Sequence, residues 1–202
     1  MIRHVLLDAD GVLQYLPGGF LAALEPYLGD RAGEFLAAAA VDEQPCLRGD
    51  GDFRSSLGDH LERYGVPHPV AEVYPAIWHR IEVEPASVDL VHALRESGLG
   101  VHLATNQEAG RASYMKRELA YDDLFDESFY SCDLGAAKPE SAFFAAAVDR
   151  LGATAPQVLF VDDHAPNVDA AREVGLAAEQ WHIADGFDRL HALLSGHGIV
   201  LH

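Results

Sequence analysis

Residues 158–161 read VLFV, an apolar run without a polar interruption, and two acids follow it directly. A strand that does not alternate between polar and apolar residues is covered on both faces, which is typical of the centre of a parallel sheet. Neighbouring parallel strands need a long crossover between them, usually a helix. The run therefore predicts an α/β chain in which strands and helices alternate.

The rest of the chain after residue 85 follows this alternation, and apolar residues 5–7 add a first strand to the same sheet. The further expected strands are residues 101–104, the weaker 129–131, 158–161 and a last short one before residue 187. The expected helices are one capped by Ser87 that stops at Ser97, one through Tyr114 and Leu119, and residues 141–151, 167–174 and 187–194. We therefore expect a doubly wound parallel sheet, that is, a Rossmann-like core.

Between the first strand and residue 86 the hydrophobic pattern has a helical period. Apolar residues recur at helical spacing in three segments within residues 20–83, and Gly and Pro separate these segments. No second strand in this stretch is as clear as the first. We expect residues 1–14 and 86–202 to form the core, and residues 15–85 to form an all-helical cap inserted into it.

The composition excludes several function classes. The chain has 202 residues, 49% hydrophobic and 23% charged, which suits one compact domain with an insert and disfavours disorder. It has 14 Lys and Arg against 32 Asp and Glu and no Lys/Arg cluster, so we expect no binding to nucleic acid or to a membrane surface. Two cysteines, no signal peptide and no apolar stretch of about 20 residues predict a cytoplasmic protein. The sequence leaves monomer and homodimer open.

Polar residues gather where the expected strands end. Ligands of parallel α/β sheets bind beyond the carboxyl ends of the strands, so these residues are the candidates for chemistry. They are Asp8, Asp10, Thr105, Asn106, Lys138, Asp162 and Asp163. Carboxylate oxygens suit a hard divalent cation such as Mg²⁺, which offsets the repulsion between the acids and can also neutralise a phosphoryl group. The sequence therefore predicts a Mg²⁺ site at this edge of the sheet.

The same residues fall into four motifs along the chain. The motifs are DADGVL at residues 8–13, LATN at 103–106, KP at 138–139 and VDD at 161–163. In this order they resemble the haloacid dehalogenase-like hydrolase superfamily, in the subgroup that carries an all-helical cap after the first strand. The double acid and the residues after it are similar to the branch that holds small sugar-phosphate phosphatases and the phosphatase domain of soluble epoxide hydrolase.

The resemblance implies a chemical role for five of these residues. Asp8 would attack phosphorus and form an aspartyl-phosphate. Asp10 would protonate the leaving oxygen and then deprotonate the attacking water. Thr105 and the Asn106 amide would bind the phosphoryl group, and Lys138 would neutralise the charge on it and on the nucleophile.

The resemblance also implies a metal site and a substrate class. Asp8, Asp163 and the main-chain carbonyl of Asp10 would bind Mg²⁺, and Asp162 would bind it directly or through water. The implied function is a Mg²⁺-dependent phosphatase that hydrolyses a small phosphorylated metabolite, for example a sugar phosphate. The cap would close over the substrate, which leaves little room for a macromolecule at the nucleophile.

Three other functions remain as alternatives. A phosphomutase of the same fold stays open, because Val12 replaces the commoner threonine, a departure that phosphomutases of the family share. A dehalogenase is less favoured, because dehalogenases of the family place a residue other than an acid at the position of Asp10. A phospho-receiver domain uses similar groups, but its acid pair precedes the Thr and Lys, whereas here Asp162 and Asp163 come last.

Some residues outside the motifs are weaker candidates. His164 directly follows the acid pair, and Asp52 is expected to cap a helix that starts near Phe53 rather than to bind calcium. The expected specificity residues of the cap are Tyr15, Arg48, Trp78 and His79, with Glu25 and Asp52 as possible partners for hydroxyl groups.

Overall fold

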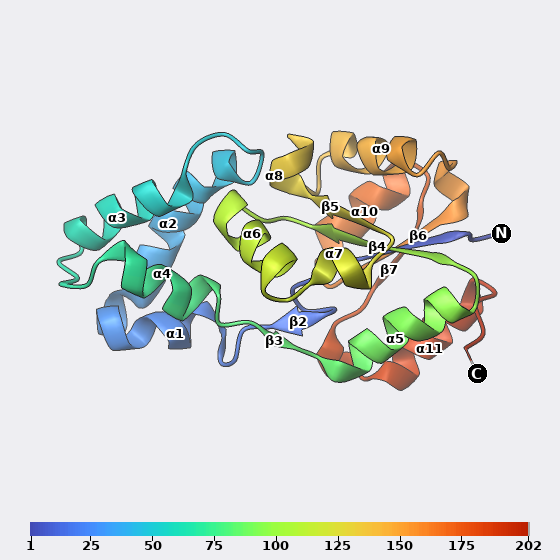
Figure 1. Ribbon diagram of the computed structural model, residues 1–202, viewed down its shortest axis with the longest axis horizontal. Coiled ribbons are helices and arrows are strands. Elements are labelled where there is room, and N and C mark those ends of the chain that lie inside the picture. Colours follow the sequence, from blue (N-terminus) through green and yellow to red (C-terminus); the bar gives the residue numbers. More distant parts are fainter. Residues whose placement is uncertain (202) are drawn as a thin grey trace.

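The computed structural model describes residues 1–201, and its main sheet has five parallel strands in the order β5-β4-β1-β6-β7 (Figure 1). The strands are β1 (His4–Leu7), β4 (Gly100–Thr105), β5 (Glu127–Tyr130), β6 (Val158–Asp162) and β7 (Ala177–Gln180). β1 lies between β4 and β6, and all five residues of β6 are buried. The predicted doubly wound α/β fold with a Rossmann-like core is confirmed.

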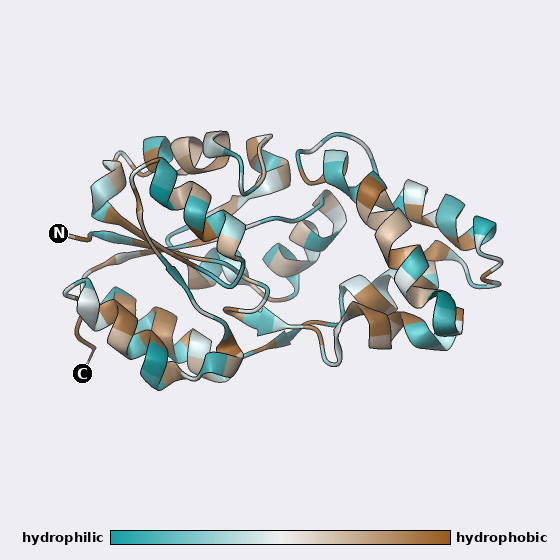
Figure 2. Ribbon diagram, turned by 180° about the vertical axis from the view of Figure 1, so that it is seen from behind, coloured by the Kyte–Doolittle hydropathy of each residue, from teal (hydrophilic) through white to brown (hydrophobic). Residues whose placement is uncertain are grey.

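Helices cover both faces of the sheet, because side chains alternate between the faces along each strand. Val5 and Leu7 of β1 pack with α5 (Pro85–Glu96), α6 (Ala109–Arg117), α7 (Tyr121–Leu124) and α11 (Phe187–Gly196). Leu6 points to the opposite face, which α9 (Ser141–Arg150) and α10 (Ala165–Glu173) cover. Figure 2 shows hydrophobic residues along the central strands between these helical layers. The shorter elements are α8 (Ser131–Leu134), η2 (Ala155–Gln157) and η3 (Ile183–Asp185).

Four helices between β1 and α5 form a separate body, which we call the helical insert (Figure 1). They are α1 (Gly19–Leu28), α2 (Ala32–Cys46), α3 (Phe53–Arg63) and α4 (Val70–Trp78), with the short η1 (Gly29–Arg31) between the first two. Their apolar faces make a hydrophobic core of their own, centred on Phe35, Leu57 and Tyr74. The longest helix that the structure describes is α2, with 15 residues, and no described helix has both the length and the apolar character to cross a membrane.

The chain enters and leaves the helical insert through a two-stranded antiparallel ribbon that the sequence analysis did not predict. β2 (Gln14–Tyr15) pairs with β3 (Glu82–Val83), and the Tyr15 hydroxyl donates a hydrogen bond of 2.9 Å to the Glu82 carboxylate. Each strand has only two residues, too few to show an alternating pattern in the sequence. The two crossings into the helical insert therefore lie side by side.

Other local predictions need correction. Ser87 does not cap α5: Glu84 accepts the hydrogen bond from the Ala86 amide, and the buried Ser87 hydroxyl donates to the Val12 carbonyl. The helix through Tyr114 ends at Arg117, before Leu119, and Ser131 begins α8 rather than ending β5. The predicted cap at Asp52 is confirmed, because its side chain accepts from the Arg54 amide.

Candidate active site

A cavity of about 400 Å³ opens at the carboxyl edge of the sheet. Six of the seven predicted site residues line it: Asp8, Asp10, Thr105, Asn106, Lys138 and Asp163. They come from the ends of β1, β4 and β6 and from the loop after α8, which are far apart in the sequence and adjacent at this edge. The seventh, Asp162, lies behind the cavity wall and is fully buried.

Asp8 is placed by the centre of the sheet. Its backbone N–H donates to the Val161 carbonyl of β6 at 3.0 Å, so the residue directly after β1 is held at the sheet edge. One carboxylate oxygen lies 2.8 Å from the Lys138 ammonium. Burial raises the pKa of Asp8 well above its usual range; Lys138 opposes this effect, while the Asp162 charge adds to it. A nearby cation is therefore required to keep Asp8 ionised.

Lys138 is enclosed by acceptors. Its ammonium bonds the Asp8 carboxylate, the Asp162 carboxylate at 2.7 Å and the Ala104 carbonyl at 2.7 Å, and its side chain is 1% exposed. Burial alone would lower the pKa of Lys138, but the two carboxylates outweigh burial and raise it. The lysine therefore carries its charge at the floor of the cavity.

Asn106 holds the backbone of Lys138. Its side-chain amide donates to the Lys138 carbonyl at 2.7 Å and accepts from the Lys138 amide at 2.8 Å. This two-way contact fastens the end of β4 to the loop that carries the lysine. The side chain of Asn106 is thus already engaged, which leaves its backbone N–H as the group that can face a ligand.

The Asp162 carboxylate is fully engaged in hydrogen bonds with its surroundings. Its carboxylate accepts hydrogen bonds from the His164 amide at 2.8 Å and from the Asn167 side chain at 3.0 and 3.1 Å, in addition to Lys138. With its oxygens engaged in this way and no exposed surface, Asp162 fits the orientation of Lys138 better than direct contact with a metal. Asn167 also lines the cavity, so it connects Asp162 with the cavity wall.

The acids at the cavity suit a divalent cation. Asp8, Asp162 and Asp163 each offer an oxygen, and these oxygens lie within 4.8 Å of one another. Burial raises the pKa of Asp163, and the neighbouring Asp162 charge adds to this effect, so a bound cation would favour its carboxylate form. Hard carboxylate donors match Mg²⁺. Asp8 and Asp163 are the two that also face the cavity.

Gly11 leaves room for the Asp163 carboxylate. Its φ is +81°, and a Cβ at this position would lie 2.5 Å from Asp163 Oδ2. We expect Gly11→Ala to push Asp163 out of place and to raise the Mg²⁺ concentration needed for half of the maximal thermal stabilisation by about 10-fold or more. Gly135→Ala is the matched control, since Gly135 has a φ of +71° but no atom within 4 Å of a Cβ. Equal Mg²⁺ dependence in the two variants would refute a steric effect on Asp163.

Asp10 is held by an arginine that the sequence analysis missed. Arg111 of α6 grips both oxygens of the Asp10 carboxylate, at 2.5 and 2.8 Å, and Gln14 and Gln107 each donate to one oxygen at 3.0 Å. Burial alone would raise the pKa of Asp10, but Arg111 and the hydrogen bonds outweigh burial and lower the pKa to about 2. Asp10 is therefore a carboxylate in this arrangement. Gln107 also donates to the Thr105 hydroxyl, at 2.9 Å.

Of the weaker candidates, some line the cavity in the structure and others do not. Tyr15 lines the cavity, together with Leu16 and Phe20, but Trp78 and His79 do not, and Arg48 pairs with Glu140 at the back of the KP loop. His164 is exposed and lies outside the cavity, whereas His182, which no motif marked, lines it. Glu25 does not line the cavity.

Comparisons with known proteins give the family. Residues 2–175 match the family model of haloacid dehalogenase-like hydrolases. A structure of a HAD-family enzyme from Bacteroides thetaiotaomicron, in complex with magnesium and inorganic phosphate, superposes with a TM-score of 0.79 at 21% identity, over 94% of this chain and 99% of that one. The L-2-haloacid dehalogenase of Xanthobacter autotrophicus superposes with a TM-score of 0.68 at 22% identity, over 89% of this chain and 77% of that one. At these identities the two structures show the shared fold.

A curated relative adds a sequence match. The sesquiterpene phosphatase astK of Aspergillus oryzae is 34% identical over 97 residues, which make up 48% of this chain and 48% of the relative. The match thus spans about half the length of that relative. The family model, in contrast, covers the chain from β1 through α10, including the helical insert, and ends before β7. This chain belongs to the haloacid dehalogenase-like hydrolase family.

Proposed function

We propose that the protein is a Mg²⁺-dependent phosphatase that hydrolyses a small phosphate monoester through an aspartyl-phosphate on Asp8. The observation that carries this proposal is the position of Asp8 in the cavity, 2.8 Å from the buried Lys138 ammonium and beside the Asp163 carboxylate. A carboxylate nucleophile can approach a phosphate dianion only when positive charge offsets the repulsion between them. One lysine together with one divalent cation supplies that charge.

The first step is the attack of an Asp8 oxygen on phosphorus. The P–O bond to the alcohol breaks as the bond to Asp8 forms, so the phosphoryl group moves to the carboxylate. Lys138 stabilises the charge on the transferred oxygens, and the Thr105 hydroxyl with the Asn106 backbone N–H bonds them. Mg²⁺, when bound by Asp8, Asp163 and the Asp10 carbonyl, supplies a positive charge that reduces the repulsion between nucleophile and phosphate.

The second step returns the enzyme to its starting state. Asp10, as a carboxylate, accepts a proton from water while the water oxygen attacks the aspartyl-phosphate, and inorganic phosphate leaves. In the first step the alcohol oxygen needs a proton, which Asp10 supplies when it is protonated. The pKa of about 2 in the present arrangement favours the carboxylate, which is the form that the second step uses.

The acidic residue at position 10 favours phosphoryl transfer over removal of a halide. A halide leaves as a stable anion and needs no proton, whereas an alkoxide leaving group does. The ion pair of Asp10 with the buried Arg111 and the hydrogen bonds from Gln14 and Gln107 keep this carboxylate at the cavity. Release of a halide needs no proton donor, so that reaction gives no reason to hold a carboxylate at this position.

The cavity wall beyond the phosphate site favours an uncharged, largely apolar alcohol. Leu16, Phe20 and the ring of Tyr15 line this part, which belongs to β2 and to the start of α1. Lys138 is the one Lys or Arg among the cavity-lining residues described, and it is already shared by two carboxylates. A second phosphate on the substrate would therefore find no lysine or arginine of its own among these residues. The curated relative is named as a sesquiterpene phosphatase, which agrees with an apolar alcohol.

In this proposal the helical insert, residues 15–85, acts as a cap over the cavity. Its first helix brings Phe20 to the cavity, and the ribbon β2–β3 carries Tyr15. Such a cap shields the reacting groups from bulk solvent, apart from the water that attacks the aspartyl-phosphate, and admits substrates that fit below it.

A panel of phosphate monoesters tests the proposed function. The protein is assayed with sugar monophosphates and bisphosphates, nucleotides, phosphorylated acids and prenyl or alkyl monophosphates, each with Mg²⁺ and with EDTA. We expect Mg²⁺-dependent release of inorganic phosphate, with higher kcat/KM for the alkyl and prenyl esters than for bisphosphates. Transfer of the phosphoryl group to a sugar phosphate faster than to water would instead identify a phosphomutase. No phosphate release from any ester would refute the proposal.

Metal removal should affect stability as well as activity. We expect EDTA to abolish activity reversibly, and Mg²⁺ at about 100 times its Kd to stabilise the fold by about 2.7 kcal/mol. Burial raises the pKa of Asp8 and of Asp163, so protons compete with the metal, and the stabilisation should shrink as pH falls through these raised values. Thermal melts with MgCl₂ against KCl of equal ionic strength measure it. A shift that is the same at acid and neutral pH would count against binding by these carboxylates.

A further inference from the structure

Arg111 is a buried cation that the proposed reaction does not use directly. Its side chain is 6% exposed, and the arginine lies within the first turn of α6, beside the cavity-lining Asp10. Its two terminal nitrogens bond the Asp10 carboxylate, and one of them also donates to the Gln107 side chain at 2.8 Å. The third nitrogen, Nε, donates to the Trp78 carbonyl at 2.9 Å. Every nitrogen of the guanidinium therefore has a partner.

The contact with Asp10 fixes an orientation as well as a charge. Two parallel N–H···O bonds from a planar guanidinium hold the plane of a carboxylate, which a single ammonium cannot do. The Asp10 side chain is 44% exposed, so the arginine holds one side of it and leaves the other open to the cavity. Gln14 and Gln107 bond one oxygen each and add to this restraint.

The contact with Trp78 connects the same guanidinium to the helical insert. Trp78 is the last residue of α4, directly before the chain returns to the core through β3. A second contact joins the same two helices: the Tyr74 hydroxyl of α4 donates to the Glu108 carboxylate, which caps α6 by accepting from the Gly110 and Arg111 amides at 2.7 Å. The end of α4, the start of α6 and the Asp10 carboxylate thus form one continuous hydrogen-bonded network.

We propose that Arg111 is a positioning residue that orients the Asp10 carboxylate toward the oxygen of the leaving alcohol and ties this orientation to the end of α4. The proposal rests on the proposed function, because it assigns Asp10 to proton transfer. Arg111 itself touches neither the phosphoryl group nor the nucleophile, since its contacts are with Asp10, Gln107 and Trp78.

The test separates proton transfer from the other parts of the reaction. Under single-turnover conditions, with enzyme in excess and saturating Mg²⁺, the release of alcohol is measured from p-nitrophenyl phosphate and from an unactivated alkyl monophosphate. p-Nitrophenolate leaves without a proton, whereas an alkoxide requires one, so only the alkyl ester depends on a correctly placed Asp10. The wild type and the variants Arg111→Met and Arg111→Lys are compared on both esters.

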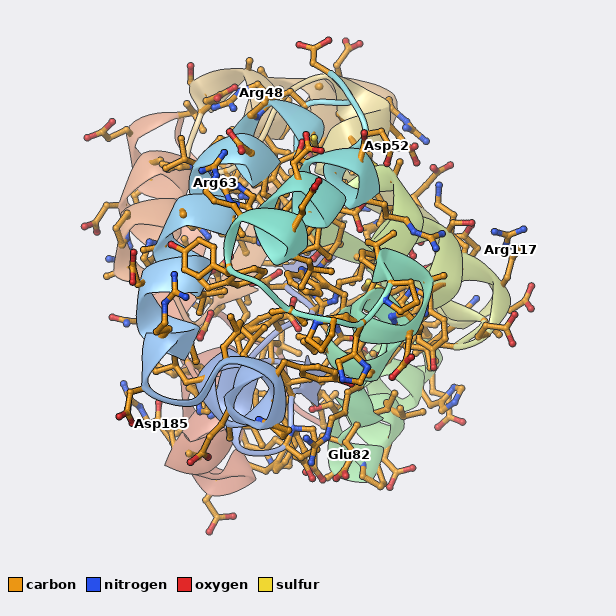
Figure 3. All side chains as sticks on the ribbon, turned by 90° about the vertical axis from the view of Figure 1, so that its left-hand side faces the viewer. Arg48, Asp52, Arg63, Glu82, Arg117 and Asp185 are labelled. Carbon is orange, nitrogen blue, oxygen red and sulfur yellow. The ribbon has the colours of Figure 1, made fainter. Side chains whose placement is uncertain are left out.

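We expect Arg111→Met to slow alcohol release from the alkyl ester by about 10²-fold or more and release of p-nitrophenolate by less than about 10-fold. Arg111→Lys keeps the charge but cannot hold both oxygens and the Trp78 carbonyl together, so its loss on the alkyl ester should lie between those of the wild type and the methionine variant. Arg117→Met is the control from the same helix. Arg117 points into solvent (Figure 3) and bonds Ser113 alone, so both rates should stay at the wild-type level.

The outcomes are distinguishable. Equal losses on the two esters, in variants whose thermal melts show a folded protein, would overturn the positioning role. If Arg111→Met does not fold, Arg111→Lys takes its place in the test. The ratio of its alkyl-ester rate to its p-nitrophenyl phosphate rate then shows whether the positioning role holds. If the wild type releases alcohol from neither ester, the proposed phosphatase function fails, and that result is distinct from an altered ratio.

Discussion

Asp8→Asn is expected to lower kcat by about 10⁴-fold or more, because an amide neither attacks phosphorus nor contributes charge to Mg²⁺. Lys138 keeps its second carboxylate partner, Asp162, so the buried ammonium is not left alone. Steady-state release of inorganic phosphate, together with a search for phosphoenzyme after acid quench, measures the effect. Phosphoenzyme in the variant, or turnover within about 10-fold of the wild type, would refute Asp8 as the nucleophile.

The same variant gives an independent result for stability. Burial raises the pKa of Asp8 above the value of an unfolded chain, so its ionisation at neutral pH opposes folding when no metal is bound. A neutral amide removes this effect, and in EDTA we expect a Tm no lower than about 3 °C below the wild type. In Mg²⁺ the variant should gain less than the wild type. Asp169→Asn, which removes an exposed carboxylate from α10, is the control and should leave both melts unchanged.

Lys138→Met is expected to destabilise the fold by about 3 to 5 kcal/mol and to abolish turnover, because two buried carboxylates lose their shared cation. The ammonium is 1% exposed and lies 2.8 Å from Asp8 and 2.7 Å from Asp162, so water cannot replace it without opening the sheet edge. Denaturant unfolding in EDTA gives the free-energy change. Lys116→Met removes an exposed lysine that pairs with Asp133, and its cost should stay below about 1 kcal/mol.

The loss of unfolding free energy in Lys138→Met should depend on pH, because it arises from the ionised carboxylates of Asp8 and Asp162. Without Lys138, the pKa of Asp8 rises further in the folded state, so the folded protein binds more protons than the unfolded chain. The missing stability should therefore return as pH falls, and the double variant Lys138→Met/Asp162→Asn should recover part of it at neutral pH while remaining inactive. A deficit that does not change with pH would mean that lost packing, not unbalanced charge, dominates.

The sheet and most of the cavity were predictable because their signals are local. A buried parallel strand is a short apolar run, and the polar residue directly after it must lie at the carboxyl edge, so Asp8, Thr105 and Asp163 follow from their neighbours in sequence. The partner of Asp10 was not predictable in this way. Arg111 lies 101 positions away, and no spacing rule connects a loop residue with a helix of another crossover. The i, i+4 spacing of Gln107 and Arg111 after the strand end was the available hint.

Adjacent residues of one motif were harder to separate. Asp162 and Asp163 look equivalent in sequence, yet one is fully buried beneath Lys138 and the other lines the cavity, because successive side chains at the end of β6 point in opposite directions. Ser87 was assigned as a helix cap from its residue type alone, but Glu84 precedes it and takes that place. In both cases the direction or position of a side chain in the folded structure, not its residue type, decides its role.

Both chain crossings between the core and the helical insert run through the ribbon β2–β3. Gln14 lies opposite Val83 and Tyr15 opposite Glu82, at the roughly 4.8 Å spacing of neighbouring strands. The helical insert also has a hydrophobic core that is separate from the two clusters flanking the main sheet. A different helical bundle whose ends meet at the same spacing can therefore be grafted at this ribbon without disturbing the strand that delivers Asp8. Such a graft keeps the orientation of Asp10 only if its last helix again offers a carbonyl to Arg111, as Trp78 does here.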